Sequence, residues 1–300
     1  MTPMTRRQVL LLVALTLMWG CNWPVMKFSL REVPPLTFRA LTMTGGVLLV
    51  AAWFALRGTS LALPRTQIVR VTALALPNII GWHLASIIGL TQLAAGRAVI
   101  LAFTMPVWTV LLGALLFGQR LSRRAGIASL CALAAVALLA QQELGSLAGR
   151  PVGMLWLQAA AISWAVGTLL LKRVTVTLST EALTLWMMVI GSAFFCVAAL
   201  AVEPLPTPSR WSTATWASLA WGAVINFGIS QLLWFALARE LPAQASAFSL
   251  MAVPMVGVLS SALVIGEAPR VSDWIAVLFI AAAIAAATGL TLRRGDNPRR

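Results

Sequence analysis

Residues 93–118 read LAAGRAVILAFTMPVWTVLLGALLFG, and residues 241–266 read LPAQASAFSLMAVPMVGVLSSALVIG. Both stretches carry a proline at the same place, Pro106 and Pro254, and both end in glycine at an offset of 148 residues. Asn78 and Asn226 correspond at that same offset, whereas Trp19 corresponds to Trp164 at an offset of 145 residues. The chain therefore repeats itself, and we expect two units, residues 1–144 and residues 145–300.

The composition predicts a membrane protein independently of the repeat. Of the 300 residues, 60% are hydrophobic and only 10% are charged, and the mean hydropathy is +0.90. A soluble core could not hide so much apolar surface, because the faces of a soluble protein must be polar. In hydrocarbon the backbone must satisfy its own hydrogen bonds, so the spans are expected to be helices.

Apolar runs of about 20 residues, long enough to cross a bilayer, recur along the whole chain. Each half holds five of them, and five is odd, so the second half must enter the bilayer in the opposite orientation. Such inverted repeats are typical of transporters. The sequence thus predicts an all-α integral membrane protein with ten transmembrane helices in two inverted five-helix repeats. The ten expected spans are residues 8–28, 34–56, 68–91, 95–117, 124–141, 152–172, 180–202, 211–238, 243–265 and 271–292.

Lysine and arginine gather on one side of the predicted bundle. That side holds fifteen of them and the other side six, so the positive-inside rule places both termini in the cytoplasm. The net charge of +14 follows from basic residues that face anionic headgroups, and nucleic acid is not an expected partner. The first span, after Arg6 and Arg7, is expected to be an uncleaved helix. Three widely spaced cysteines indicate free thiols.

Three motifs resemble those of a known superfamily. They are Met18-Trp19-Gly20-x-x-Trp23-Pro24 in the first span, Gly118-Gln119-Arg120 after the fourth and Gly266-Glu267-Ala268 after the ninth. Together with the ten spans they make the chain similar to the EamA-type ten-helix carriers of the drug/metabolite transporter superfamily, and within it most similar to the YddG-type amino-acid exporters. The resemblance implies a multi-pass protein of the bacterial inner membrane that exports aromatic and other, mainly neutral, amino acids without a cofactor.

Pro106 and Pro254 lie near the middle of their spans, where each removes a backbone donor. We interpret them as hinges for alternating access between the two repeats. The alternative is that kinked helices simply pack better.

Polar residues in mid-span are costly unless they face a cavity or another helix. On an ideal helix, Asn78, His83 and Ser86 would share one face of the third span, and the repeat places a second polar set on the eighth span. These side chains could hydrogen-bond the ammonium and carboxylate groups of an amino acid, or they could join helix to helix. The substrate-binding residues that we predict are Trp19, Asn22, Asn78, His83, Ser86, Trp108, Trp164, Asn226, Ser230 and Gln231.

The tryptophans in that set lie close to mid-span, unlike those near span ends, which are expected to anchor the interface. An indole at this depth packs as core or offers a flat face to an apolar or cationic side chain. Trp19 and Trp164 correspond across the repeat, which favours cavity lining for that pair.

None of the eight acidic residues is expected deep in a span. Ion-coupled carriers usually hold the ion with a buried carboxylate, so we predict facilitated transport rather than proton antiport. Arg39 lies about five residues into the second span, within reach of the headgroups by snorkelling, so we expect a structural role for it in preference to a carboxylate-binding site.

With one histidine and no buried acid, the chain lacks the parts of an intramembrane enzyme and of a metal site. A multidrug or other metabolite exporter of the same superfamily remains the alternative to an amino-acid exporter. We expect a monomer whose partners are the substrate and the lipid bilayer.

Overall fold

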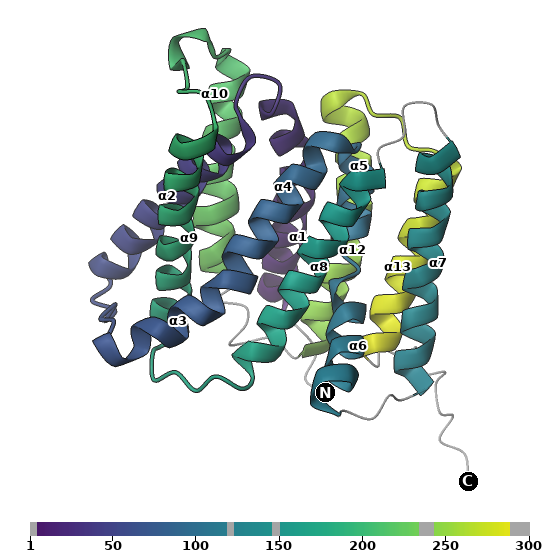
Figure 1. Cartoon of the computed structure of the whole chain (residues 1–300), viewed down its shortest axis with the longest axis horizontal. Coiled ribbons are helices and arrows are strands. Elements are labelled where there is room, and N and C mark those ends of the chain that lie inside the picture. The colour runs from purple at the N-terminus through teal and green to yellow at the C-terminus, as the bar shows by residue number, and fades with distance from the viewer. Residues whose placement is uncertain (1–4, 119–122, 146–150, 234–242, 289–300) are drawn as a thin grey trace.

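Helices make up the fold, and no strand occurs in the part of the chain that the structure describes (Figure 1). The structure is a computed structural model and describes residues 5–118, 123–145, 151–233 and 243–288. Its helices are α1 (Arg6–Ser29), α2 (Pro35–Leu56), η1 (Arg65–Gln67), α3 (Ile68–Ala75), η2 (Leu76–Gly81), α4 (Trp82–Gln92), α5 (Ala95–Ala102), α6 (Met105–Phe117), α7 (Arg123–Gly145), α8 (Pro151–Leu171), α9 (Thr180–Val202), η3 (Pro208–Arg210), α10 (Thr213–Ala220), η4 (Trp221–Ile229), α12 (Ala243–Ile265) and α13 (Val271–Thr288).

These helices are suited to a bilayer in length and in composition. Within the described residues, seven helical segments are long and apolar enough to cross a membrane, and three shorter apolar helices, Gly126–Gln141, Ala252–Ile265 and Val271–Ala286, accompany them. Large side chains such as Leu115, Leu200 and Leu263 are 79%, 69% and 86% exposed on the outside of the bundle. An all-α membrane protein is therefore confirmed, because such surfaces are stable against lipid and not against water.

Three of the expected spans depart from a regular α-helix along their length. The fourth breaks between α5 and α6, just before Pro106. The third and eighth contain π-helical segments, η2 and η4, which overlap when the repeat offset of 148 residues is applied. Pro77 in η2 lacks the N–H that a regular helix needs, which explains the first of these segments. π-Helical turns inside α-helices frequently mark functional sites.

The bundle is held together by packing between the two halves of the chain. Helix α1 packs against α12, α2 packs against both α9 and η4, and α4 packs against α8. Helix α1 begins, and α13 ends, at the lower edge of Figure 1. We call this edge the lower end of the bundle. The opposite edge, which holds residues 30–34, 93–94, 203–212 and 266–270, is the upper end.

Glycines allow the helices of the two halves to approach closely. A Cβ atom at Gly46 of α2 would meet the Cβ of Phe227 in η4, and one at Gly167 of α8 would meet the side chain of Asn78 in η2. Small residues at such crossings are the usual means by which membrane helices gain van der Waals contact, since lipid leaves little hydrophobic drive between them. The π-helical segments are thus clamped by glycines of neighbouring spans.

We expect Gly46→Ala to destabilise the bundle by about 1–3 kcal/mol, the usual cost of overpacking a filled interior. The measurement is thermal unfolding in detergent. Gly126→Ala is the matched control, because nothing lies within 4 Å of a Cβ built at Gly126 in α7. The control should hold or raise the unfolding temperature, since alanine is the better helix former. Equal losses in both variants would refute the role of the α2–η4 crossing.

Candidate transport site

A cluster of polar and aromatic side chains lies among α2, α4 and η4. Arg39 of α2 is only 2% exposed, and its Nη2 donates to Oγ of Ser86 in α4 at 3.5 Å. The Arg39 guanidinium lies 5.9 Å from the ring centre of Phe227 in η4, and the His83 ring lies 5.2 Å from the same ring. The Ser86 hydroxyl donates to the backbone oxygen of His83 at 3.3 Å. We call these four residues the Arg39 cluster, and the burial of Arg39 shows that it does not snorkel to the headgroups.

Asn78 has different neighbours from those of His83 and Ser86. Its side chain is buried against Gly167 of α8, and its amide donates to the backbone oxygen of Leu74 at 2.8 Å. Asn78 itself belongs to the π-helical segment η2, whereas His83 and Ser86 belong to α4. The structure therefore brings His83 and Ser86 together and places Asn78 against a different neighbour.

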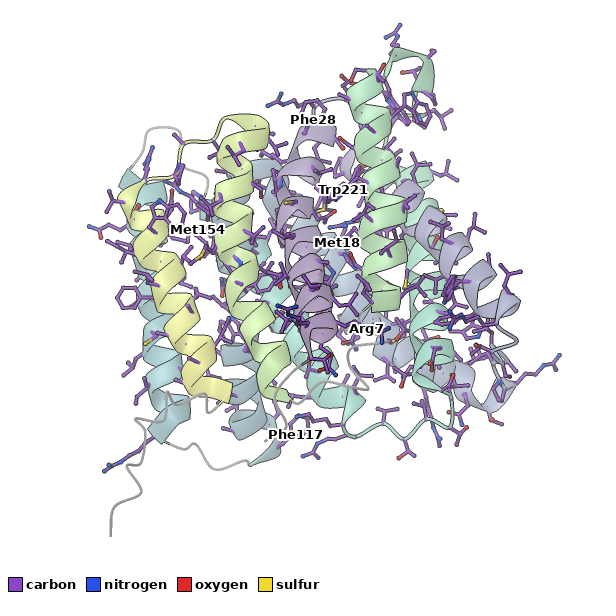
Figure 2. All side chains as sticks on the ribbon, turned by 180° about the vertical axis from the view of Figure 1, so that it is seen from behind. Arg7, Met18, Phe28, Phe117, Met154 and Trp221 are labelled. Carbon is purple, nitrogen blue, oxygen red and sulfur yellow. The ribbon has the colours of Figure 1, made fainter. Side chains whose placement is uncertain are left out.

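The predicted polar residues of the first and eighth spans are buried or half-buried in the bundle. Asn22 of α1 is 6% exposed and its Oδ1 has no hydrogen-bond partner, whereas Asn226 and Gln231 are half-buried. Ser230 is fully buried, donates to the oxygen of Ile225 at 2.7 Å and lies 3.5 Å from the sulfur of Met18. Figure 2 shows Phe28 and Arg7 at opposite ends of α1 with Met18 between them, so Ser230 lies at intermediate depth.

The three predicted tryptophans have different neighbours, and their role in lining a cavity stays a prediction. Trp19 is half-buried against the main core, while Trp164 packs edge-on against Trp82 of α4 with ring centres 5.1 Å apart. Trp108 donates from Nε1 to Gln158 Oε1 of α8 at 2.8 Å. Sequence reasoning missed Gln158, which also donates to the backbone oxygen of Leu101 at 3.2 Å. Gln158 thus satisfies the backbone where α5 and α6 part.

The two prolines have different local structures. Pro106 stands in the first turn of α6, directly after the break, where a missing N–H costs nothing. Pro254 lies inside α12, which continues from Ala243 to Ile265. The hinge role of both residues stays a prediction, and the visible break occurs in the first half of the chain.

Acidic residues join the two halves at the upper end. Glu203, which follows α9, accepts from the backbone N–H groups of Leu36 and Thr37 at 2.7 Å each, and from the Thr37 hydroxyl at 2.8 Å. It thereby caps α2, whose own N-cap, Pro34, provides no side-chain hydrogen bond. Glu32, which follows α1, accepts from the Ser212 N–H at the start of α10 at 2.8 Å.

Two further carboxylates complete this set. Glu267, after α12, accepts from the Ala95 N–H at the start of α5 at 2.7 Å, and Asp273 of α13 accepts from Arg97 Nε of α5 at 3.1 Å. We call Glu32, Glu203, Glu267 and Asp273 the upper clasp, because each binds the opposite half of the chain. Sequence reasoning placed these acids in loops and at helix ends but did not predict their partners.

The upper clasp borders a cavity of about 270 Å³. Its lining residues are Lys27, Leu30, Arg31, Thr91, Ile265 and Glu267. Burial raises the pKa of Glu267, against the opposing effect of hydrogen bonds from Ala95 and Gly96. The hydrogen bond from the Ser212 N–H lowers the pKa of Glu32, and the Thr215 hydroxyl adds to this.

At the lower end, arginine and tryptophan side chains make the contacts between the two halves that are described next. Arg70 donates to the backbone oxygen of Thr175 at 3.1 Å, and Trp186 Nε1 donates to that of Leu61 at 2.7 Å. Arg173 lies 3.7 Å from the ring centre of Phe117. Within the described residues, no group of three or more His, Cys, Asp or Glu side chains could hold a metal ion.

A helical bundle with a lipid-facing surface, interrupted spans and polar residues inside is the architecture of a multi-pass membrane transport protein. The sequence pattern of the EamA-like transporter family matches residues 6–141 and again residues 151–289. The chain belongs to this family, and it is an inner membrane transporter that resembles the drug/metabolite superfamily as expected.

Relatives of known sequence extend over almost the whole chain. The uncharacterized transporter YvbV of Bacillus subtilis is 27% identical and covers 93% of this chain and 90% of its own length. The uncharacterized inner membrane transporter YedA of Escherichia coli is 24% identical. A protein named probable amino-acid metabolite efflux pump, also of Escherichia coli, is 26% identical and covers 88% of this chain and 89% of its own length. A crystal structure with a TM-score of 0.67 and 23% identity covers 97% of this chain and 99% of its own, and shows that the fold is shared.

We expect Glu203→Ala to loosen the upper end, because it leaves the first N–H groups of α2 without their acceptor. The loss of a helix cap costs about 0.5–2 kcal/mol. A cysteine at Leu30, in a background without native cysteines, should react faster with a polar thiol reagent, and the unfolding temperature should fall. Arg210→Ala, an exposed change at the same end, is the control and should leave both unchanged. Unchanged labelling in Glu203→Ala would argue against the clasp.

Glu32 and Glu267 should respond to pH in opposite senses. The pKa of Glu32 is lowered in the clasp, so its contact is present at neutral pH and is lost as pH falls through that lowered pKa. The pKa of Glu267 is raised, so falling pH favours the closed clasp, in which this carboxyl is buried.

Labelling of the same cysteine between about pH 3 and pH 8, a range that extends below the ordinary pKa of glutamate, checks this sign. Glu32→Gln should abolish the acid-side increase in labelling. Glu267→Gln, which resembles the protonated side chain, should keep the labelling slow at neutral pH. Identical pH profiles for the two variants would contradict the assignment.

Proposed function

We propose that this chain exports amino acids, mainly neutral ones and aromatic ones among them, from the cytoplasm by facilitated alternating access. The observation that carries the proposal is the interior itself. Apart from Glu181 and Asp273 in the first turns of their helices, its described buried polar side chains are amides, hydroxyls, a histidine and one arginine, set among aromatic rings. This chemistry suits a small zwitterion with an apolar side chain, because amides supply both donors and acceptors and rings supply apolar faces. The relative named as an amino-acid metabolite efflux pump supports the same class of substrate.

In this proposal the two family matches are inverted repeats that swap between inward-open and outward-open packings. We place the lower end in the cytoplasm, because the expected spans put fifteen lysines and arginines of the sequence on that side, Arg7 among them (Figure 2), and six on the other. The upper clasp then closes the external side. The break before Pro106 and the two π-helical segments are the points at which spans bend.

Facilitated transport is proposed because of where the acids lie. The described ones lie in turns, beside helix ends or in the first turn of a helix, as Glu181 and Asp273 do. A carboxylate deep in a span, which would hold a coupling ion, is not among them. Downhill flux of substrate then needs no ion gradient.

The second candidate is a multidrug carrier for organic cations. The indole faces of Trp82 and Trp164 favour it. The buried guanidinium of Arg39 opposes it, since a second positive charge in a desolvated interior would be repelled. The amino-acid exporter is therefore the better supported function.

Counterflow in proteoliposomes tests the proposal. Vesicles preloaded with unlabelled amino acid should take up radiolabelled phenylalanine or leucine without any ion gradient, and His83→Ala should reduce the uptake at least about tenfold, or roughly 1.4 kcal/mol of lost stabilisation. Thr168→Ala is the control, because its hydroxyl bonds Trp164 of its own helix. Uptake that requires an imposed pH gradient would overturn the facilitated mechanism. Uptake of organic cations in place of amino acids would favour the second candidate.

A further inference from the structure

Arg39 is a buried cation without a counter-charge among the residues that the structure describes. Its side chain is 2% exposed, its single polar contact among the described residues is the long one to Ser86 at 3.5 Å, and its Nε has no hydrogen-bond partner. The four carboxylates of the upper clasp are bound to Leu36, Thr37, Ala95, Ser212 and Arg97. Among the described residues, no ion pair joins Arg39 to an acid.

Such an arrangement is costly. Removing a charge from water without pairing it is among the most unfavourable steps in folding, and arginine in a span almost always faces a partner or a substrate pathway. The contact with Phe227 at 5.9 Å, at the limit of cation–π range, offsets little of this cost. The arrangement is explained if the counter-charge arrives with a ligand.

The neighbours of Arg39 are suited to that ligand. Ser86 presents a hydroxyl beside the guanidinium, and the buried Nδ1 of His83 has no hydrogen-bond partner. The Phe227 ring lies against both Arg39 and His83. The cluster thus combines a planar cationic fork, polar atoms and an aromatic face, and three different helical segments contribute to it.

Arg39 also breaks the symmetry of the repeat. The positions that correspond to it in the second half, at offsets of 145 and 148 residues, are Thr184 and Met187, and neither carries a charge. A site with one cation on one side binds an anion in one orientation. Lys27, another described cation, lies in the last turn of α1. It donates to the backbone oxygens of Leu90 and Thr91.

We propose that Arg39 is the anchor for the carboxylate of the transported amino acid, with Ser86 beside it and with His83 and Phe227 against the rest of the substrate. This inference rests on the proposed function. A guanidinium matches a carboxylate with two parallel hydrogen bonds, and one unpaired cation neutralises one carboxylate. A doubly charged phosphate ester would leave a net negative charge in the interior.

Ligand-induced thermal shifts of the full chain in detergent test the anchor. The probes are L-phenylalanine, 3-phenylpropionate, which lacks the amino group, and 2-phenylethylamine, which lacks the carboxylate. The first two should raise the unfolding temperature of the wild-type protein, and the amine should not. Arg39→Gln should weaken the response to both carboxylates at least about tenfold, roughly 1.4 kcal/mol, while Arg210→Gln should leave it intact.

The unfolding temperature of the ligand-free Arg39→Gln protein distinguishes a substrate anchor from an arginine that only stabilises the fold. Removing an unpaired buried charge relieves its desolvation cost, so its unfolding temperature should equal or exceed that of the wild-type protein. Arg39→Lys is the second variant, because it keeps the charge but loses the planar fork. Phenylalanine should then bind more weakly to a folded protein.

Three results would overturn the anchor: unchanged carboxylate binding in these variants, equal shifts with 2-phenylethylamine and L-phenylalanine, or a ligand-free Arg39→Gln protein that is markedly less stable. The proposed function fails separately. If wild-type vesicles transport no amino acid but 3-phenylpropionate still shifts the protein in an Arg39-dependent way, the anchor stands and the substrate is another carboxylate.

Discussion

The need to pair every backbone polar group away from water governs this structure. Hydrocarbon offers no hydrogen bonds, so an interrupted helix is tolerated only where protein side chains satisfy the groups that it frees. At the break between α5 and α6, Gln158 of α8 donates to the oxygen of Leu101. At the π-helical segment η2, Ser163 of α8 donates to the oxygen of Pro77 at 2.9 Å, and Asn78 donates to that of Leu74. Helix α8 therefore supports both irregular segments of the first half, and the bends of the bundle depend on the opposite half of the chain.

The carboxylates of the upper clasp also lie where their polar groups find partners, at the helix ends. Four carboxylates bind helix starts or an arginine of the other half at the upper end, where water and helix dipoles stabilise them. The interior holds Arg39 with its polar and aromatic neighbours. Carboxylates at the upper end and Arg39 in the interior are consistent with a carrier that binds an anionic group.

The sequence predicted much of the fold because its signals are local or periodic. Hydropathy located the spans, and the offset of Pro106 and Pro254 located the repeat. The site was predicted less well. An ideal helix put Asn78 on the face of Ser86, whereas in the structure Asn78 packs against Gly167 and Ser86 contacts Arg39. Arg39 was expected within snorkelling reach of the headgroups because its distance from the helix end is short, yet α4 and η4 cover it. Gln158 carried no sequence signal, because a single glutamine in a span does not reveal which broken helix it faces.

By itself the sequence determined that this is a helical membrane protein with a repeated half and with its acids near the ends of the spans. Those properties follow from composition and spacing, which act along the chain. Only the tertiary structure decided that Glu203 caps α2, that Trp164 packs on Trp82 rather than on its counterpart Trp19, and that Arg39 is buried beside Ser86 and Phe227. These contacts join residues that are distant in the chain. They depend on how helices cross and where glycines let them approach, and no local pattern encodes that geometry.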